Sequence, residues 1–190
     1  MTTVEKIINY ALDSQDKTRG ELGLVKSGHW CAEFVSYIID KAIPNNNVTS
    51  ISCTRMQANM SQSNAWSEPD DDIKAGDIIF YNWDHDYDPT GNLDHVGIVV
   101  DVQQNFIRTI EGNTVNSGNP TDPSNPVKLK TRYRNSLSFY TTYPDYYMRY
   151  IGDEPTTNPT PTAQTPSTDI MQAITDIQKA LDKLKNLYHI

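Results

Sequence analysis

Residues 31–43, CAEFVSYIIDKAI, predict a helix that follows a polar, glycine-containing segment and ends before Pro44. Farther along the chain, residues 95–102, HVGIVVDV, predict a β-strand, because apolar and β-branched residues are bounded by turn residues. Further helices are predicted at residues 3–13 and, more weakly, 54–66, and further strands at residues 77–81, 106–110 and 146–151. Since helices precede strands, this order predicts an α+β domain with an antiparallel sheet.

The chain has 190 residues, enough for one domain of common size and an appendage. We expect the folded domain in residues 1–152, although residues 112–145, rich in Asn, Pro, Ser and Tyr, indicate no clear strand. Residues 153–168 contain four prolines and many threonines, which is typical of an extended linker.

Residues 169–190 predict an amphipathic helix after this linker. A single helix this short is marginal alone in water, so its apolar face requires a partner. The favoured interpretation is a homo-oligomer formed through residues 170–188, and the alternative is docking onto the folded domain. The apolar residues follow a heptad spacing and are Ile170, Ile174, Ile177, Leu181, Leu184 and Tyr188.

Composition excludes several classes of partner. The formal net charge is −8 and no cluster of Lys or Arg stands out, which argues against nucleic acid. No stretch approaches the roughly 20 apolar residues of a membrane span, so no membrane insertion is expected. Residues 1–15 lack a basic region followed by a long apolar run, which predicts no Sec signal. The two cysteines, Cys31 and Cys53, leave open one disulfide or two free thiols.

Cys31 lies where the polar segment becomes the predicted helix. Unpaired backbone N–H groups and the helix dipole favour a thiolate at such a position, and the same N–H groups can bind an oxyanion. The alternative is a small buried apolar side chain, which is what most free cysteines are. Trp30 beside it is expected to shape a substrate-binding cleft, whereas Cys53 is interpreted as structural.

His95 is the favoured partner for Cys31, because a rigid apolar strand would hold its ring. The next strand ends in Ile110-Glu111-Gly112-Asn113, so in an antiparallel hairpin Glu111 would return near His95 and fix its tautomer. The alternatives are a structural histidine and a solvated glutamate at a strand end. The competing histidines lie near Cys31, in an acidic loop and in the terminal tail; they are His29, His85 and His189.

Four motifs follow one another along the chain: Trp30-Cys31-Ala-Glu-Phe-Val-Ser-Tyr, Gly76-Asp77-Ile-Ile-Phe-Tyr, Asp94-His95-Val-Gly-Ile-Val and Ile110-Glu111-Gly112-Asn113. Together they resemble the CHAP domain, the cysteine- and histidine-dependent amidohydrolase/peptidase family related to papain-like NlpC/P60 enzymes. The resemblance covers about residues 1–152 and implies a papain-like fold. It also implies a nucleophile at Cys31, a base at His95, an orienting acid at Glu111 and an auxiliary polar residue at Asn113.

The resemblance further implies a peptidoglycan hydrolase in which the thiol attacks an amide carbonyl. The bond is either the muramoyl–L-alanine amide or a peptide bond of the stem or cross-bridge. We expect a phage lysin that stays in the host cytoplasm until it is released to the cell wall, or an enzyme that is secreted or virion-associated by a non-Sec route. The alternatives are a non-catalytic wall-binding or assembly module on the same fold and an intracellular small-molecule amidase.

Residues 84–94, DHDYDPTGNLD, place carboxylates at alternating positions just before His95. Oxygen ligands with this spacing suit Ca²⁺, so the segment predicts a calcium site; no other cofactor is expected. An EF-hand loop would have Gly where Pro89 stands and Glu where His95 stands, so a solvated acidic turn is the alternative. The candidate ligands are Asp84, Asp86, Asp88 and Asp94.

Overall fold

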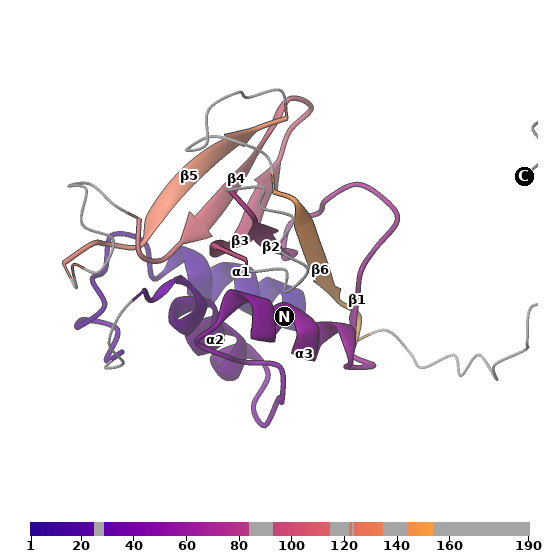
Figure 1. The fold of residues 1–190 in the computed structure, drawn as a ribbon, viewed down its shortest axis with the longest axis horizontal. Coiled ribbons are helices and arrows are strands. Elements are labelled where there is room, and N and C mark those ends of the chain that lie inside the picture. The colour runs from indigo at the N-terminus through magenta and orange to yellow at the C-terminus, as the bar shows by residue number, and fades with distance from the viewer. Residues whose placement is uncertain (25–28, 84–92, 115–121, 123, 135–143, 154–190) are drawn as a thin grey trace, which may run out of the picture. The chain divides into compact units, whose positions relative to one another are not determined.

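A computed structural model describes residues 1–24, 29–83, 93–114, 122, 124–134 and 144–153 (Figure 1). The chain divides into two units, Met1–Pro155 and Thr156–Ile190, and every described residue belongs to the first. Apart from Asp153, the predicted linker and the predicted helix at residues 169–190 lie outside the described residues. The homo-oligomer through residues 170–188 therefore stays a prediction. Among the described residues, no helix is long and apolar enough to cross a bilayer.

The described part of the chain begins with three helices: α1 (Thr3–Leu12), α2 (Cys31–Ala42) and α3 (Cys53–Ser61). A capping box starts α1, because Thr2 accepts a hydrogen bond from the Glu5 N–H while Glu5 accepts one from the Thr2 N–H. Ser52 caps α3 by accepting from the Arg55 N–H. α3 is shorter than predicted, because the chain leaves the helix at Gln62 and Trp66 pairs with β6 instead.

The described strands form a six-stranded antiparallel sheet in the order β1-β6-β2-β3-β4-β5. This confirms the α+β class and the antiparallel sheet. β5 lies in the segment where the sequence indicated no clear strand, and the two-residue β1 was also not predicted. The strands are β1 (Trp66–Ser67), β2 (Ile78–Tyr81), β3 (His95–Val102), β4 (Phe106–Glu111), β5 (Lys128–Tyr133) and β6 (Tyr146–Tyr150).

The three helices lie on one side of the sheet (Figure 1). Alternate strand residues such as Phe80 and Ile98 pack with the helices in the main core, whereas Ile79 and Val99 belong to a second cluster. α2 packs against both α1 and β3. This packing places the first turn of α2 beside the start of β3, where the candidate active site forms.

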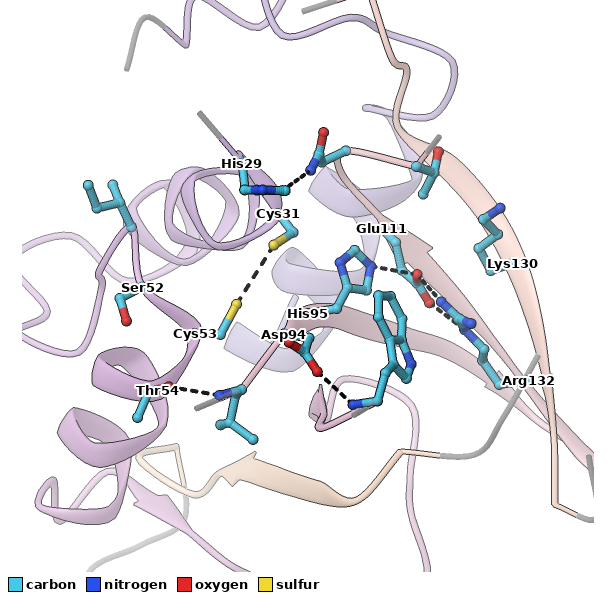
Figure 2. Close-up of a pocket in the computed structure, with 15 residues that line it drawn as sticks. His29, Cys31, Ser52, Cys53, Thr54, Asp94, His95, Glu111, Lys130 and Arg132 are labelled. Carbon is cyan, nitrogen blue, oxygen red and sulfur yellow. Dashed lines mark hydrogen bonds and ion pairs between the residues drawn. The ribbon is translucent and has the colours of Figure 1, made fainter. Parts of the chain in front are cut away.

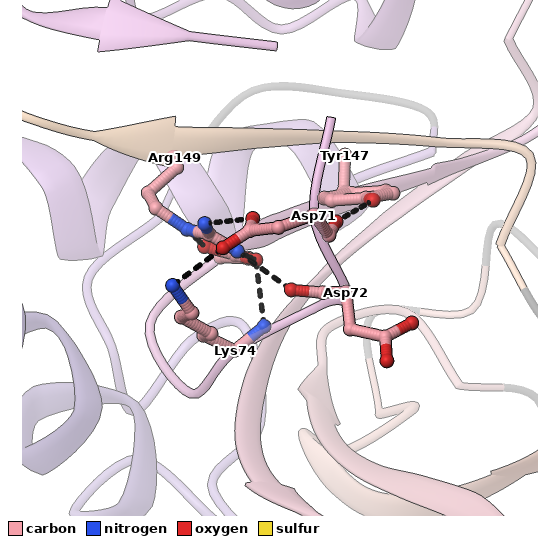
Figure 3. Close-up of polar contacts among 6 residues, drawn as sticks. Asp71, Asp72, Lys74, Tyr147 and Arg149 are labelled. Carbon is pink, nitrogen blue, oxygen red and sulfur yellow. Dashed lines mark hydrogen bonds and ion pairs between the residues drawn. The ribbon is translucent and has the colours of Figure 1, made fainter. Parts of the chain in front are cut away.

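A network of charged residues attaches the segment before β2 to strand β6 (Figure 3). Arg149 on β6 donates from Nε and Nη2 to the two carboxylate oxygens of Asp77, each at 2.8 Å. Arg149 also contacts the Asp71 carboxylate and donates to the Asp72 carbonyl at 2.9 Å. The Lys74 N–H donates to Asp77 at 2.8 Å. Because Asp77 is 1% exposed, Arg149 is its main compensation for lost hydration.

We expect Arg149→Met to lower the free energy of unfolding by about 3 kcal/mol, because it leaves the Asp77 carboxylate buried without its counter-charge. Lys74→Met is the matched control, since its ion pair with Asp71 has side chains that are 62% and 48% exposed. Such an exposed pair contributes at most about 1 kcal/mol. Urea denaturation of both variants measures the difference, and equal losses would contradict the assignment.

Candidate active site

A cavity of about 570 Å³ lies where the first turns of α2 and α3 approach the start of β3 and the end of β4 (Figure 2). Cys31, His95 and Glu111 line it together with Asn113 and Asp94. The structure therefore brings the predicted nucleophile, base and orienting acid into one site. The other lining residues are His29, Ile51, Ser52, Cys53, Thr54, Trp83, Leu93, Thr114, Lys130 and Arg132.

Cys31 is the first residue of α2 and is 4% exposed. The side chain of the N-cap residue Trp30 does not cap the helix, so first-turn N–H groups are left for the sulfur or for a substrate oxygen. A hydrogen bond from the Cys53 thiol lowers the pKa of Cys31 most, and it is opposed by burial. The charge of His95 and the Ala32 N–H lower that pKa further. The pKa of Cys31 lies well below its ordinary value, which favours the thiolate.

His95 begins β3, and its ring lies between Cys31 and Glu111 (Figure 2). Nε2 of His95 is 2.8 Å from Oε2 of Glu111, which leaves Nδ1 for the sulfur. Burial alone would lower the pKa of His95, but the charge of Cys31 and hydrogen bonds with Cys31 and Glu111 outweigh burial and raise the pKa to about 9. The ring also stacks on Trp83, with centroids 5.0 Å apart. The two shifts share a cause, because the thiolate and the imidazolium stabilise each other across their contact.

Glu111 ends β4 and is fully buried. Its Oε1 accepts from Thr109 Oγ1 at 2.5 Å and from Arg132 Nε at 2.9 Å, while Oε2 faces His95. Burial would raise the pKa of Glu111, but the charge of Arg132 and the hydrogen bond with His95 outweigh it and hold this pKa well below its ordinary value. Gly97 on β3 leaves room for the side chain, since a Cβ there would lie 2.7 Å from Cγ of Glu111. Glu111 is thus an ionised acceptor held in one orientation.

Arg132 on β5 was not predicted as a site residue. It is 2% exposed, its Nε and Nη2 both contact the Glu111 carboxylate, and its guanidinium lies 4.7 Å from the centre of the Tyr81 ring. The hydropathy pattern of β5 would predict that Leu129 and Tyr133 are buried and that Arg132 faces solvent. In the structure, Leu129 and Tyr133 are 40% and 48% exposed, whereas Arg132 is buried. The ion pair with the Glu111 carboxylate compensates the buried guanidinium for its lost hydration.

Cys53, which the sequence analysis interpreted as a structural residue, lies beside the candidate nucleophile. It is the first residue of α3, and its Sγ is 3.7 Å from Sγ of Cys31. A helix-start signal was present in the sequence, because Ser52 directly precedes Cys53 and is a preferred N-cap residue. Trp83, which stacks on His95, is another cavity residue that the sequence analysis missed.

Asn113 lies at the cavity beside Glu111, as predicted, whereas Trp30 does not line it. Asn113 lines the cavity with a left-handed φ of 58°, and its Nδ2 lies 3.5 Å from Nδ1 of His29. Trp30 is fully buried and packs edge-to-face on Phe34, with ring centroids 6.4 Å apart. Since Trp30 is also not among the described residues that line the cavity, it supports the start of α2 from the core and does not shape the cleft.

Of the four predicted calcium ligands, only Asp94 belongs to the described residues. Its Oδ2 accepts a hydrogen bond from the Trp83 N–H at 2.6 Å. Among the described residues, no group of three or more His, Cys, Asp or Glu side chains is arranged to hold a metal ion. Asp84, Asp86 and Asp88 lie outside the described residues, so calcium binding stays a prediction.

Residues 24–113 match the CHAP domain family. The chain contains a CHAP domain. The matched span includes the nucleophile candidate Cys31, His95, Glu111 and Asn113, and it confirms the resemblance drawn from the four motifs.

The fold of this CHAP protein is similar to that of Ly7917 in two crystal structures, one of them with the hydrolyzing product of MDP. Each comparison has a TM-score of 0.50 and 18% sequence identity, over 78% of this chain and 63% of Ly7917. This chain therefore spans less than two thirds of the length of Ly7917, and the likeness is one of fold. No curated protein matches the chain.

Proposed function

We propose that this CHAP protein is a peptidoglycan hydrolase that cleaves an amide bond through a thioester on Cys31. The observation that carries the proposal is the buried line of contacts from Cys31 through His95 to Glu111 at one cavity. Thiol, imidazole and carboxylate in this order are the groups that acyl transfer requires. The similarity of fold to Ly7917, whose structure holds a hydrolysis product of MDP, supports a wall-derived substrate.

In this mechanism, the Cys31 thiolate attacks the amide carbonyl carbon, and the developing oxyanion lies beside the first-turn N–H groups of α2. The imidazolium of His95 then donates its proton to the leaving amine, and the acyl group remains on sulfur as a thioester. Neutral His95 next takes a proton from water, which releases the acyl group as a carboxylate. Glu111 favours the charged form of the ring at each step by accepting from Nε2.

Two other functions compete with this proposal. A non-catalytic wall-binding module would have no need for a buried carboxylate paired to the histidine, and this pairing favours the enzyme. An intracellular small-molecule amidase would use the same chemistry. The Pro/Thr-rich segment and the heptad pattern that follow the CHAP domain favour a modular lysin-like enzyme over that alternative.

Digestion of purified peptidoglycan, followed by mass spectrometry of the soluble fragments, tests the proposal. We expect turbidity to fall and new amino termini to appear. Termini on L-alanine would identify an amidase, and termini on stem or cross-bridge residues would identify an endopeptidase. Fragments cut only at glycosidic bonds, or binding to the wall without any fragments, would contradict it. Cleavage of small amides with intact walls would support the intracellular amidase.

The rate of hydrolysis should fall as the pH rises through about 9, because His95 then loses the proton that the leaving amine needs. The pKa of Cys31 is lowered, so the acid limb of the rate profile, where the thiolate is protonated, lies below the ordinary thiol value of 9.0. Initial rates on a soluble muropeptide across this range measure kcat/KM against pH. A profile that rises through 6.5, the ordinary pKa of histidine, and stays level above 9 would contradict the ion pair.

A further inference from the structure

The thiol of Cys53 faces the nucleophile inside the cavity. The two sulfurs are 3.7 Å apart, and Figure 2 shows them pointing toward one another from the first turns of α2 and α3. Cys31 and Cys53 are 4% and 6% exposed, and both are free. The hydrolysis proposed above uses only the first of them. The second thiol therefore needs an explanation of its own.

The surroundings of Cys31 suit reaction with a small oxidant. A thiolate, and not a thiol, is the form of cysteine that hydroperoxides oxidise, and the helix start and His95 favour this form. The cavity of about 570 Å³ reaches the sulfur, while the low exposure of Cys31 restricts access to small reagents. A second thiol in contact with such a sulfur is the arrangement of a resolving cysteine, which converts a sulfenic acid into a disulfide.

We propose that Cys31 and Cys53 form a site of reversible oxidation by hydroperoxides, which ends in a disulfide that removes the nucleophile. In the first step, the Cys31 thiolate attacks one peroxide oxygen, so an S–O bond forms and the O–O bond breaks. The leaving hydroxide or alkoxide takes the proton of the His95 imidazolium. The sulfur is oxidised to a sulfenic acid, and the peroxide is reduced to water or an alcohol.

In the second step, Cys53 attacks the sulfur of Cys31, the S–S bond forms and the S–O bond breaks. The proton of Cys53 goes to the leaving hydroxide, which departs as water. Before oxidation, the hydrogen bond to Cys31, burial and the charge of Cys31 raise the pKa of Cys53. Formation of the neutral sulfenic acid removes the charge of Cys31, so the resolving thiol ionises more readily at the stage where it is needed.

A disulfide is about 2.05 Å long, so the sulfurs must approach from their present 3.7 Å. They are already in direct contact, because each is the hydrogen-bond partner of the other. α2 and α3 also pack against one another, so both helix starts are held at this distance. Reduction by a dithiol would restore both thiols and the nucleophile.

Treatment of the full chain with hydrogen peroxide, followed by alkylation and peptide mass spectrometry, tests the proposal without any wall substrate. We expect a peptide pair joined through Cys31 and Cys53 and the loss of both free thiols, reversed by a dithiol. Cys31 found as sulfinic acid, or both cysteines found alkylated, would overturn the proposal. This readout stays informative even if the chain hydrolyses no peptidoglycan.

Cys53→Ala and Cys53→Ser extend the test to rates, each compared with its own untreated rate. Without a resolving thiol, a second equivalent of peroxide, supplied in excess, oxidises the sulfenic acid to irreversible sulfinic acid and is itself reduced to water. We therefore expect a dithiol to restore the full rate of the peroxide-treated wild type and to restore none in either variant. Equal recovery in wild type and variants would contradict the resolving role. If both variants fail to fold, the joined peptide in the wild type still decides the question.

Discussion

Replacing Cys31 with alanine is expected to lower the rate of wall hydrolysis by about 10³-fold or more, because no other described thiol lies against the imidazole in the position of the nucleophile. Fold should be retained, since alanine occupies less space at the start of a helix. Turbidity assays on walls measure the loss. Leu129→Ala, at a 40% exposed position on β5 that is not among the cavity-lining residues, is the control that should keep the wild-type rate.

The same variant also tests the ion pair. The charge and the hydrogen bond of Cys31 raise the pKa of His95, so Cys31→Ala should bring this pKa down from about 9 toward the ordinary 6.5. NMR titration of the imidazole measures the change. An unchanged pKa would mean that the sulfur and the ring do not form the pair, even if activity were lost.

The second large effect is expected for Glu111→Gln, with a loss in kcat of about 10²–10⁴-fold, because the amide no longer stabilises the imidazolium and disturbs its tautomer. Stability should fall as well, by about 3 kcal/mol or more, since Arg132 is left buried without its counter-charge. Rates on a soluble muropeptide and urea denaturation measure the two losses.

A double variant separates these two roles of the carboxylate. Adding Arg132→Met to Glu111→Gln removes the stranded charge, so stability should recover while the rate stays low. If stability and rate both recovered, or if neither did, the two roles assigned to the Glu111 carboxylate would be contradicted.

The difference in free energy of unfolding between wild type and Glu111→Gln should also become smaller in acid. Because the pKa of Glu111 is lowered in the fold, its contribution is present above the ordinary 4.5 and is lost as the pH falls toward the folded value.

The chain order of Cys31, His95 and Glu111 made much of the site predictable. His95 opens β3 and Glu111 closes β4, so a short antiparallel hairpin had to bring them together once the strands were recognised. The position of Cys31 at a helix start followed from the polar segment before it. Local pattern was sufficient here, because each of these residues lies at the end of a regular element.

Residues whose role depends on distant packing were not predictable in the same way. Arg132 is buried on a strand whose apolar residues face solvent, so its hydropathy pattern concealed it. The contact between Cys53 and Cys31 depends on how α2 and α3 pack, which no spacing encodes. Trp30 was misjudged, because its place next to the nucleophile in sequence suggested a cleft residue, whereas its ring is fully buried and does not line the cavity.

Strands β3, β4 and β5 are consecutive neighbours, and each supplies one member of the row His95, Glu111 and Arg132. Among the described strands, β5 lies at an edge of the sheet and pairs only with β4. If β5 separated from β4, the Glu111 carboxylate would lose Arg132. The His95 imidazole would then no longer face a carboxylate held in one orientation. The proposed activity therefore depends on β5 staying paired with β4.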